Sequence, residues 1–397
     1  MEYKKNVVLG VCGGIAAYKA LDVVSTLRKK GINVDVIMTE HAAEFVTPLT
    51  FQSLSYNAVI VDMFEEPKVW EIQHISLAKK ADLILVVPAT ANIIGKVANG
   101  IADDMLSTTI MASKAPVIFA PAMNTNMLEN PIVQQNIDKL KSFGYEFIEP
   151  ASGRLACGDE GKGKLPDSKL ISEIVLTKLY ENKDLLGKKV LVTAGPTIAP
   201  IDPVRFICNH SSGKMGYAIA EEARDRGAEV LLITGPTDLN TPHGIEVIQV
   251  NTNNEMFNAV MDNYSNNDII VKCAAVADYK PEAYSEIKIK KAGEILELKL
   301  VQDTDILFEL GKRKSEKQVL IGFAAESNDL IQNAKQKIEK KNLDYIVAND
   351  IMSKDTGFSS DYNRVNIISR DGEMVSLDKM SKREVAREIF NTIGKRR

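Results

Sequence analysis

Short, nearly continuous apolar segments alternate with longer polar-faced segments along the whole chain. In the first half, apolar segments lie at 4–14, 34–38, 82–87, 116–120 and 145–148. In the second half, they lie at 188–195, 229–233, 247–250, 269–273, 319–324, 345–348 and 365–368. Apolar strands separated by helices are typical of a parallel sheet that is covered on both faces. The pattern therefore predicts an α/β fold.

The two halves repeat one local arrangement of helix, glycine and strand. The periodicity predicts a helix over Ile15–Lys30 that ends at Gly31 and another over Lys214–Arg226 that ends at Gly227. At 397 residues the chain is long enough for two cores. We expect two doubly wound parallel-sheet domains, at 1–186 and 187–397, and a final helix over Lys379–Ile393.

Composition and charge narrow the class of protein. The chain is 45% apolar and 26% charged, with a formal net charge of −4, so we expect neither nucleic acid nor a membrane as partner. Its four cysteines are far apart, which argues against a disulfide scaffold and a structural zinc site. No secretory signal and no apolar run of ~18 residues is present. We therefore expect a cytoplasmic protein.

A glycine-rich segment, Gly153–Gly163, carries the cysteine Cys157 between the two α/β patterns. Its four glycines disfavour both helix and strand, because each adds backbone entropy that folding must remove. The segment is therefore expected to be a loop. A loop of this length is typical of a lid or a binding loop. The residues alone leave open a surface loop with an incidental cysteine.

Three further motifs fall where predicted strands end, and such ends bind ligands in open α/β sheets. The glycine turn Gly10–Gly14 lacks the G-x-G-x-x-G pattern but precedes a helix that favours phosphate. Pro88–Asn92 and Pro121–Asn124 offer small residues and amides that suit a flat ring, or they are simple turns. His74 lies early in a short amphipathic helix. It is either a solvated surface residue or a catalytic base. Gly213-Lys214 is not a P-loop, because Met215 follows it.

Together these motifs resemble two known enzyme families. The first half, with Gly13–Lys19, His74, Pro88–Asn92, Pro121–Asn124 and Ala156–Asp159, resembles the homo-oligomeric flavin-containing cysteine decarboxylases. The second half resembles phosphopantothenate–cysteine ligase through Thr193–Thr197, Ile201–Arg205, Asn209–Gly216, Ala274–Asp278 and Lys288–Lys291. In this order they resemble the bifunctional coenzyme A biosynthesis proteins over essentially the whole chain. The resemblance implies a flavodoxin-like domain followed by a Rossmann-like ligase domain.

For the second half, the resemblance implies CTP-dependent ligation of cysteine to 4′-phosphopantothenate through an acyl-cytidylate, with Mg²⁺. Asn209 and Arg205 match positions that handle the intermediate, and amide and guanidinium groups can bind its oxygens. Asp278 is also the expected metal ligand. The implied nucleotide-binding residues are Ala274, Ala275, Asp278, Lys288, Thr304, Asp305, Ile306, Leu307, Phe323, Lys337 and Lys341. No base-reading pattern in the residues distinguishes CTP from ATP.

For the first half, the resemblance implies FMN-dependent decarboxylation of 4′-phosphopantothenoylcysteine to 4′-phosphopantetheine. Cys157 corresponds to the proton donor, His74 to the residue that assists thiol oxidation, and Asn124 to the residue that holds the substrate carboxylate. Cys12 stands where Thr or Ser is usual. The implied cofactor-binding residues are Gly13, Gly14, Ile15, Thr39, Pro88, Ala89, Thr90, Asn92, Ser107 and Thr108.

Other interpretations stay open at this point. The first half has relatives that are FMN-binding regulators, and others that decarboxylate peptidyl cysteine. A third interpretation is a flavodoxin-like electron carrier, but the fused nucleotide-binding half argues against it. The resemblance also implies a homo-oligomer, with trimers formed through the first half and dimers through the second, which together suggest a dodecamer.

Overall fold

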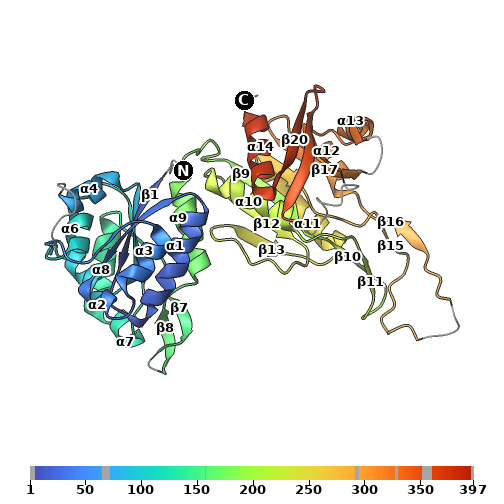
Figure 1. The fold of residues 1–397 in the computed structure, drawn as a ribbon. Coiled ribbons are helices and arrows are strands. Elements are labelled where there is room, and N and C mark those ends of the chain that lie inside the picture. Colours follow the sequence, from blue (N-terminus) through green and yellow to red (C-terminus); the bar gives the residue numbers. More distant parts are fainter. Residues whose placement is uncertain are drawn as a thin grey trace. The chain divides into compact units, whose positions relative to one another are not determined.

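The computed structural model describes residues 5–64, 72–156, 158–290, 295–326, 330–350 and 360–394. Contacts within the chain divide it into two compact units, Met1–Leu179 and Tyr180–Arg397 (Figure 1). Both units are α/β, so the predicted fold class is confirmed. The more C-terminal boundary between 186 and 187 stays a prediction.

The first unit is built on a six-stranded parallel sheet with the order β3-β2-β1-β4-β5-β6. Its strands are β1 (Asn6–Val11), β2 (Asn33–Met38), β3 (Val59–Ile60), β4 (Leu83–Ala89), β5 (Val117–Pro121) and β6 (Glu146–Phe147). β3 is a two-residue edge strand. Without it, the remaining five strands follow the flavodoxin-like order, in which the ligand site lies where the strand order reverses.

Helices cover both faces of this sheet. They are η1 (Ile15–Lys19, a 3₁₀-helix), α1 (Ala20–Lys29), α2 (Glu40–Ala43), α3 (Pro48–Ser55), α4 (Gln73–Lys80), α5 (Ala91–Ala98), α6 (Met105–Ala112), α7 (Thr125–Leu128), α8 (Pro131–Ser142) and α9 (Ser168–Leu179). Buried side chains of α1, α3 and α9 form one core, and those of α5, α6 and α8 form another. The predicted helix over 15–30 is correct in extent but begins as a 3₁₀-turn.

The glycine at the end of α1 has the role that the sequence assigns to it. Gly31 adopts φ +80°, its N–H donates to Arg28 O at 2.9 Å, and the N–H of Ile32 donates to Leu27 O at 3.1 Å. This pair of bonds is the Schellman motif, in which glycine avoids the steric cost of a positive φ. The same bonds recur in the second unit at Gly227, so the repeated helix–glycine–strand arrangement is confirmed.

The glycine-rich segment is not a loop, and this prediction is wrong. β7 (Ala151–Arg154) and β8 (Glu160–Lys164) pair as an antiparallel hairpin (Figure 1). Glycine weakens a strand by its backbone entropy, but ladder hydrogen bonds and close packing on the neighbouring segment offset that cost here. Cys157 lies outside the described residues.

The second unit has an eight-stranded sheet with the order β13-β12-β9-β14-β17-β18-β19-β20. Its strands are β9 (Lys189–Ala194), β12 (Glu229–Thr234), β13 (Glu246–Gln249), β14 (Ile269–Lys272), β17 (Val319–Glu326), β18 (Tyr345–Asp350), β19 (Tyr362–Ser369) and β20 (Met374–Ser381). The first six are parallel, and β19 and β20 are antiparallel. The sheet is therefore mixed, whereas the sequence predicts a wholly parallel one.

β20 also corrects the predicted start of the last helix. The sequence places that helix at Lys379, but strand pairing continues to Ser381 and α14 begins at Lys382. β20 is mostly exposed, so it lacks the apolar run that identifies the buried strands. Gly372 supplies the turn between β19 and β20, with φ +86°.

Helices again cover both faces. α10 (Lys214–Asp225) and α14 (Lys382–Gly394) pack on one face, and α11 (Asn253–Asn263), α12 (Ile306–Arg313) and α13 (Leu330–Lys340) on the other. η2 (Tyr264–Asn266) follows α11. Two hairpins, β10 (Ile198–Pro200) with β11 (Phe206–Cys208) and β15 (Tyr279–Pro281) with β16 (Leu300–Gln302), project from the sheet (Figure 1). No helix in the described residues is long and apolar enough to cross a membrane.

A buried carboxylate ties α10 to α14. Glu222 is fully buried and accepts from Arg226 Nε at 2.9 Å, and Arg383 Nε lies 3.1 Å from its second oxygen. Tyr180 Oη donates to the same carboxylate. A buried charge is stable only when an opposite charge or a hydrogen bond compensates it. Removal of any one of these groups should therefore destabilise the others.

Two candidate ligand cavities

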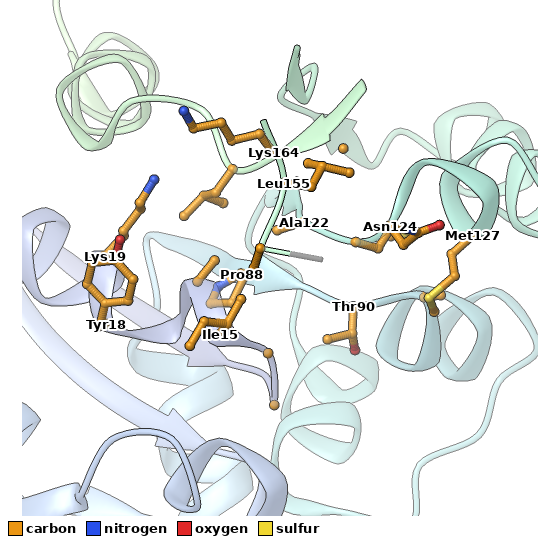
Figure 2. Close-up of a pocket in the computed structure, with 18 of the residues that line it drawn as sticks. Ile15, Tyr18, Lys19, Pro88, Thr90, Ala122, Asn124, Met127, Leu155 and Lys164 are labelled. Carbon is orange, nitrogen blue, oxygen red and sulfur yellow. The ribbon is translucent and has the colours of Figure 1, made fainter. Parts of the chain in front are cut away.

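The first unit has a cavity of about 590 Å³ at the carboxyl ends of its parallel strands. Figure 2 shows Pro88 in β4, Thr90 directly after it, Ala122 and Asn124 after β5, and Leu155 from the hairpin around the cavity. Its lining is mostly apolar, with a few polar side chains. The cavity thus forms at the edge where this class of sheet binds ligands.

Gly13 and Gly14 bring the backbone to the cavity wall. A Cβ on Gly13 would overlap His41, and a Cβ on Gly14 would meet only Thr90 Cγ2, at 3.9 Å. Thr90 caps α5, since its Oγ1 accepts from Ile93 N at 3.5 Å. Apolar walls beside exposed backbone fit a flat aromatic ring system with a few polar groups.

The hairpin is attached to the segment that carries Asn124. Met123 N donates to Gly163 O at 3.0 Å, and a Cβ on Gly163 would overlap Met123 O. The Asn124 side chain accepts from Asn126 N at 2.9 Å and donates to Asp159 Oδ2 at 3.4 Å. Asn124 and the hairpin that bears position 157 are therefore neighbours, although they lie in different parts of the sequence.

Several residues predicted for this site do not line the cavity. Two of them already cap helices: Thr39 Oγ1 accepts from Ala42 N at 3.3 Å, and buried Ser107 forms a capping box with Asp104. His74 lies on α4, half-buried. The predicted residues outside the cavity lining are Thr39, His74, Ala89, Asn92, Ser107 and Thr108. Their assigned roles stay predictions.

The second unit has a cavity of about 540 Å³, also at the carboxyl ends of parallel strands. It brings together side chains from β14, β17, α12 and α13 that are far apart in sequence. Asn209 reaches it from the β10–β11 hairpin and donates to Val276 O at 3.0 Å. The predicted residues that line it are Asn209, Ala274, Ala275, Asp278, Thr304, Asp305, Ile306, Leu307, Phe323, Lys337 and Lys341.

The N-terminus of α10 forms one wall of this cavity. Gly213 adopts φ +75°, and a Cβ there would lie 2.6 Å from Thr237 Cγ2. A Cβ on Gly216 would lie 2.5 Å from the Cβ of Ala194 on β9. Glycine thus allows the first turn of α10 to pack closely against the sheet, where the positive end of its dipole favours an anion.

Charged groups of this cavity influence one another. Lys341 pairs with Asp305 at 2.7 Å. Burial opposes ionisation of Asp305, but the bonds from Lys341 and from Phe308 N hold the pKa of its carboxyl below the usual value. Burial, then the like charge of Lys214, lowers the pKa of Lys382. Five lysines and three aspartates line the cavity, so positive charge is in excess.

Arg205 and Lys288 lie outside this cavity. Arg205 contacts Ile289, the residue that follows Lys288. Arg205 Nη1 pairs with buried Asp202 at 2.8 Å and donates to Ile289 O at 3.1 Å. Burial opposes ionisation of Asp202, but backbone N–H groups and Arg205 hold its pKa below the usual value. The catalytic role of Arg205 and the nucleotide role of Lys288 stay predictions.

The predicted metal ligand Asp278 is exposed at the cavity. In the described parts of the chain, no group of three His, Cys, Asp or Glu side chains could hold a metal ion. Mg²⁺ is often bound by one or two carboxylates together with substrate phosphates. A single aspartate is compatible with that mode.

Sequence reasoning missed three lysines of the second cavity, one of which, Lys214, it considered only as part of a P-loop pattern that does not fit. Lys272 ends β14, and Lys382 begins α14. A lysine at the end of an otherwise apolar strand is a local signal that could have identified Lys272. No local signal identifies Lys382, because only the fold brings the start of the last helix to this edge.

Two protein families match this chain and together define its class. Residues 1–180 match the Flavoprotein family, and residues 185–396 match the DNA/pantothenate metabolism flavoprotein C-terminal domain. With the fold and the two cavities, these matches define a two-domain flavoprotein of pantothenate metabolism.

Full-length relatives specify the family further. The chain is 50% identical to the coenzyme A biosynthesis bifunctional protein CoaBC of Bacillus subtilis, over 99% of this chain and 98% of that protein. It is 45% identical to the CoaBC protein of Borreliella burgdorferi, over 99% of this chain and 100% of that protein. The chain belongs to the CoaBC family.

Solved structures each match about half of the chain. The C-terminal domain of a CoaBC protein is 44% identical, covers 54% of this chain and 97% of its own, and has a TM-score of 0.47. The FMN-dependent cysteine decarboxylase SpaF is 32% identical, covers 44% and 98%, and has a TM-score of 0.39. The family assignment rests on the full-length relatives.

Proposed function

We propose that this chain catalyses two consecutive steps of coenzyme A biosynthesis. The second unit joins cysteine to 4′-phosphopantothenate with CTP, and the first unit decarboxylates the product to 4′-phosphopantetheine. One observation carries the proposal: each unit has a cavity at the carboxyl ends of its parallel strands, and each cavity gathers residues expected for one of the two reactions. The full-length relatives are named coenzyme A biosynthesis bifunctional proteins, which supports two activities in one chain.

The second cavity suits the formation of an acyl-nucleotide. In the first step the carboxylate of 4′-phosphopantothenate attacks the α-phosphorus of CTP, and pyrophosphate leaves. In the second step the amine of cysteine attacks the acyl carbon, CMP leaves and the amine loses its proton. Excess lysines and the first turn of α10 favour the phosphates, and the Asn209 amide can hold an oxygen of the intermediate. Asp278 would hold Mg²⁺ together with the phosphates.

The first cavity suits FMN, because its apolar walls and the open backbone at Gly14 leave room for a flat ring. Bound FMN would supply a reversible two-electron acceptor for the substrate thiol, which makes loss of CO₂ feasible. Asn124 lies beside the cavity with an amide that can hold the substrate carboxylate. Cys157 would supply the proton that is needed before reduction is complete, since a thiol with an ordinary pKa near ~8.5 keeps its proton at neutral pH.

The proposal also includes the oligomeric state that the family resemblance implies. We infer a cytoplasmic homo-oligomer, with trimers formed through the first unit and dimers through the second, and a dodecamer as the complete assembly. Ile15 and Tyr18 at the first cavity are 58% and 54% exposed, which suits a covering subunit. Size-exclusion chromatography with light scattering tests this assembly.

Product analysis of the purified full chain tests the function. 4′-Phosphopantothenate, CTP and cysteine should yield CMP, CO₂ and 4′-phosphopantetheine. Supplying 4′-phosphopantothenoylcysteine without CTP should yield the last two products alone. A yellow protein without turnover would indicate an FMN-binding regulator, and activity only on peptides that end in cysteine would indicate a peptidyl-cysteine decarboxylase. Parallel reactions with ATP, GTP and UTP test the preference for CTP.

A further inference from the structure

Lys272 is one of the lysines that line the second cavity, and it has no individual role in the chemistry described so far. It is the last residue of β14 and lies in register between Thr193 of β9 and Gly322 of β17, neither of which carries a charge. Its Nζ donates to Ala274 O at 2.7 Å. It keeps some accessible surface because the cavity adjoins it, although it lies deep among protein atoms.

The charges around Lys272 do not compensate it fully. Lys341 repels it, and Asp305, which attracts it, is already paired with Lys341 at 2.7 Å. Burial, then Lys341, lowers the pKa of Lys272 to about 8. The titratable groups whose charge acts on Lys272 are Lys341, Asp305, Cys273 and Asp278. The other titratable groups that line the cavity are His210, Lys214, Asp303, Lys337 and Lys382.

We propose that Lys272 is a cation of the nucleotide site that takes up a proton when the phosphates of the nucleotide enter the cavity. This inference rests on the proposed ligase function. Negative charge in the cavity favours the charged ammonium, so a Lys272 that is partly neutral before binding becomes fully charged afterwards. The proton comes from solvent, and one proton is bound for each Lys272 that was neutral.

The sign of the pH dependence follows from this linkage. Well below pH ~8 the ammonium is charged in both states, so no proton is taken up and affinity does not change with pH. Above that value, binding must include protonation, so affinity falls as pH rises. If binding restores the pKa to its ordinary value of about 10.4, the dissociation constant should rise about tenfold between about pH 7 and about pH 9.

Calorimetric titration of the full chain with CTP and Mg²⁺ tests this inference. Two buffers of different ionisation enthalpy at each pH measure the protons taken up, and CMP serves as the probe with fewer charges. Lys272→Arg should bind CTP equally well across this range, because arginine stays charged. At low pH, Lys272→Met should bind CTP more weakly than the unchanged chain does, and its affinity should not depend on pH. The substitution should weaken the binding of CMP less than that of CTP. Lys312→Met, which removes an exposed lysine of α12, should behave like the unchanged chain.

The outcomes separate the two levels of the proposal. If Lys272→Arg weakens with pH as the unchanged chain does, another group takes up the proton and the inference is wrong. If Lys272→Met binds CTP as tightly as the unchanged chain does at low pH, the ammonium of Lys272 does not stabilise the bound phosphates. If no CMP forms from CTP or ATP at any pH, the ligase function itself fails. Thermal unfolding of each variant shows whether a loss reflects misfolding.

Discussion

Gly163 is the residue where the hairpin comes closest to the backbone beside Asn124, and Gly163→Ala tests the hairpin's role. Gly163 adopts φ +141°, a conformation that residues with a side chain rarely adopt. An added Cβ would overlap Met123 O and would lie 3.4 Å from Met123 C and 3.6 Å from Asn124 C. All three atoms are backbone, so no side chain can rotate away. The hairpin or the segment after β5 must shift.

The magnitude follows from the backbone strain. A residue held in such a sparsely populated conformation costs about 1–3 kcal/mol. If the strain is relieved by undocking the hairpin, the ratio of docked to undocked hairpin falls about 5- to 150-fold. The hydrogen bond from Met123 N to Gly163 O, at 3.0 Å, is lost in the undocked state. We therefore expect decarboxylation to slow, by at most about 150-fold.

The assay follows CO₂ release from supplied 4′-phosphopantothenoylcysteine, with CMP release by the ligase and flavin absorbance measured in parallel. Ligation should not change, because the contact lies in the first unit, and the flavin absorbance shows whether the cofactor is retained. Gly144→Ala is the matched control: Gly144 has φ +87°, but apart from its chain neighbours no atom of the described residues lies within 4 Å of an added Cβ. Decarboxylation by Gly163→Ala at the rate of Gly144→Ala would refute the reasoning, as would a parallel loss of ligation.

Three further predictions concern single side chains. Cys157→Ser should keep flavin and ligation but stop after CO₂ loss and accumulate an oxidised enethiol, which mass spectrometry detects; normal product formation would contradict its role as acid. Asn209→Asp should impair formation or consumption of the acyl-cytidylate, measured by CMP release, and leave decarboxylation of supplied substrate unchanged. Glu222→Ala should destabilise the second unit by about 3–5 kcal/mol in denaturant unfolding, because buried Arg226 loses its buried carboxylate partner and keeps only a partly exposed one, Asp184. The exposed Glu229→Ala should change stability little, and equal losses would argue against the buried network.

Local pattern was sufficient for most of the two sheets and for the ends of two helices. β4 and β5 are continuous apolar runs, and β1 and β2 are nearly so; such runs are buried whichever strands flank them. Gly31 and Gly227 end their helices through bonds to residues only a few positions away. These features depend on neighbours in the sequence, so the sequence determined them by itself.

Tertiary structure decided the features that depend on a remote partner. The strands of the glycine hairpin form because they pair with each other and pack on Met123, and β20 forms because β19 pairs with it. Neither pairing leaves an apolar pattern. In the same way, nothing in the local sequence distinguishes Lys272 from any other lysine at the end of a strand. Only its burial beside Lys341 lowers the pKa of its ammonium group. Hydrogen bonding and charge act through space, so their effect on a residue depends on where the fold places it.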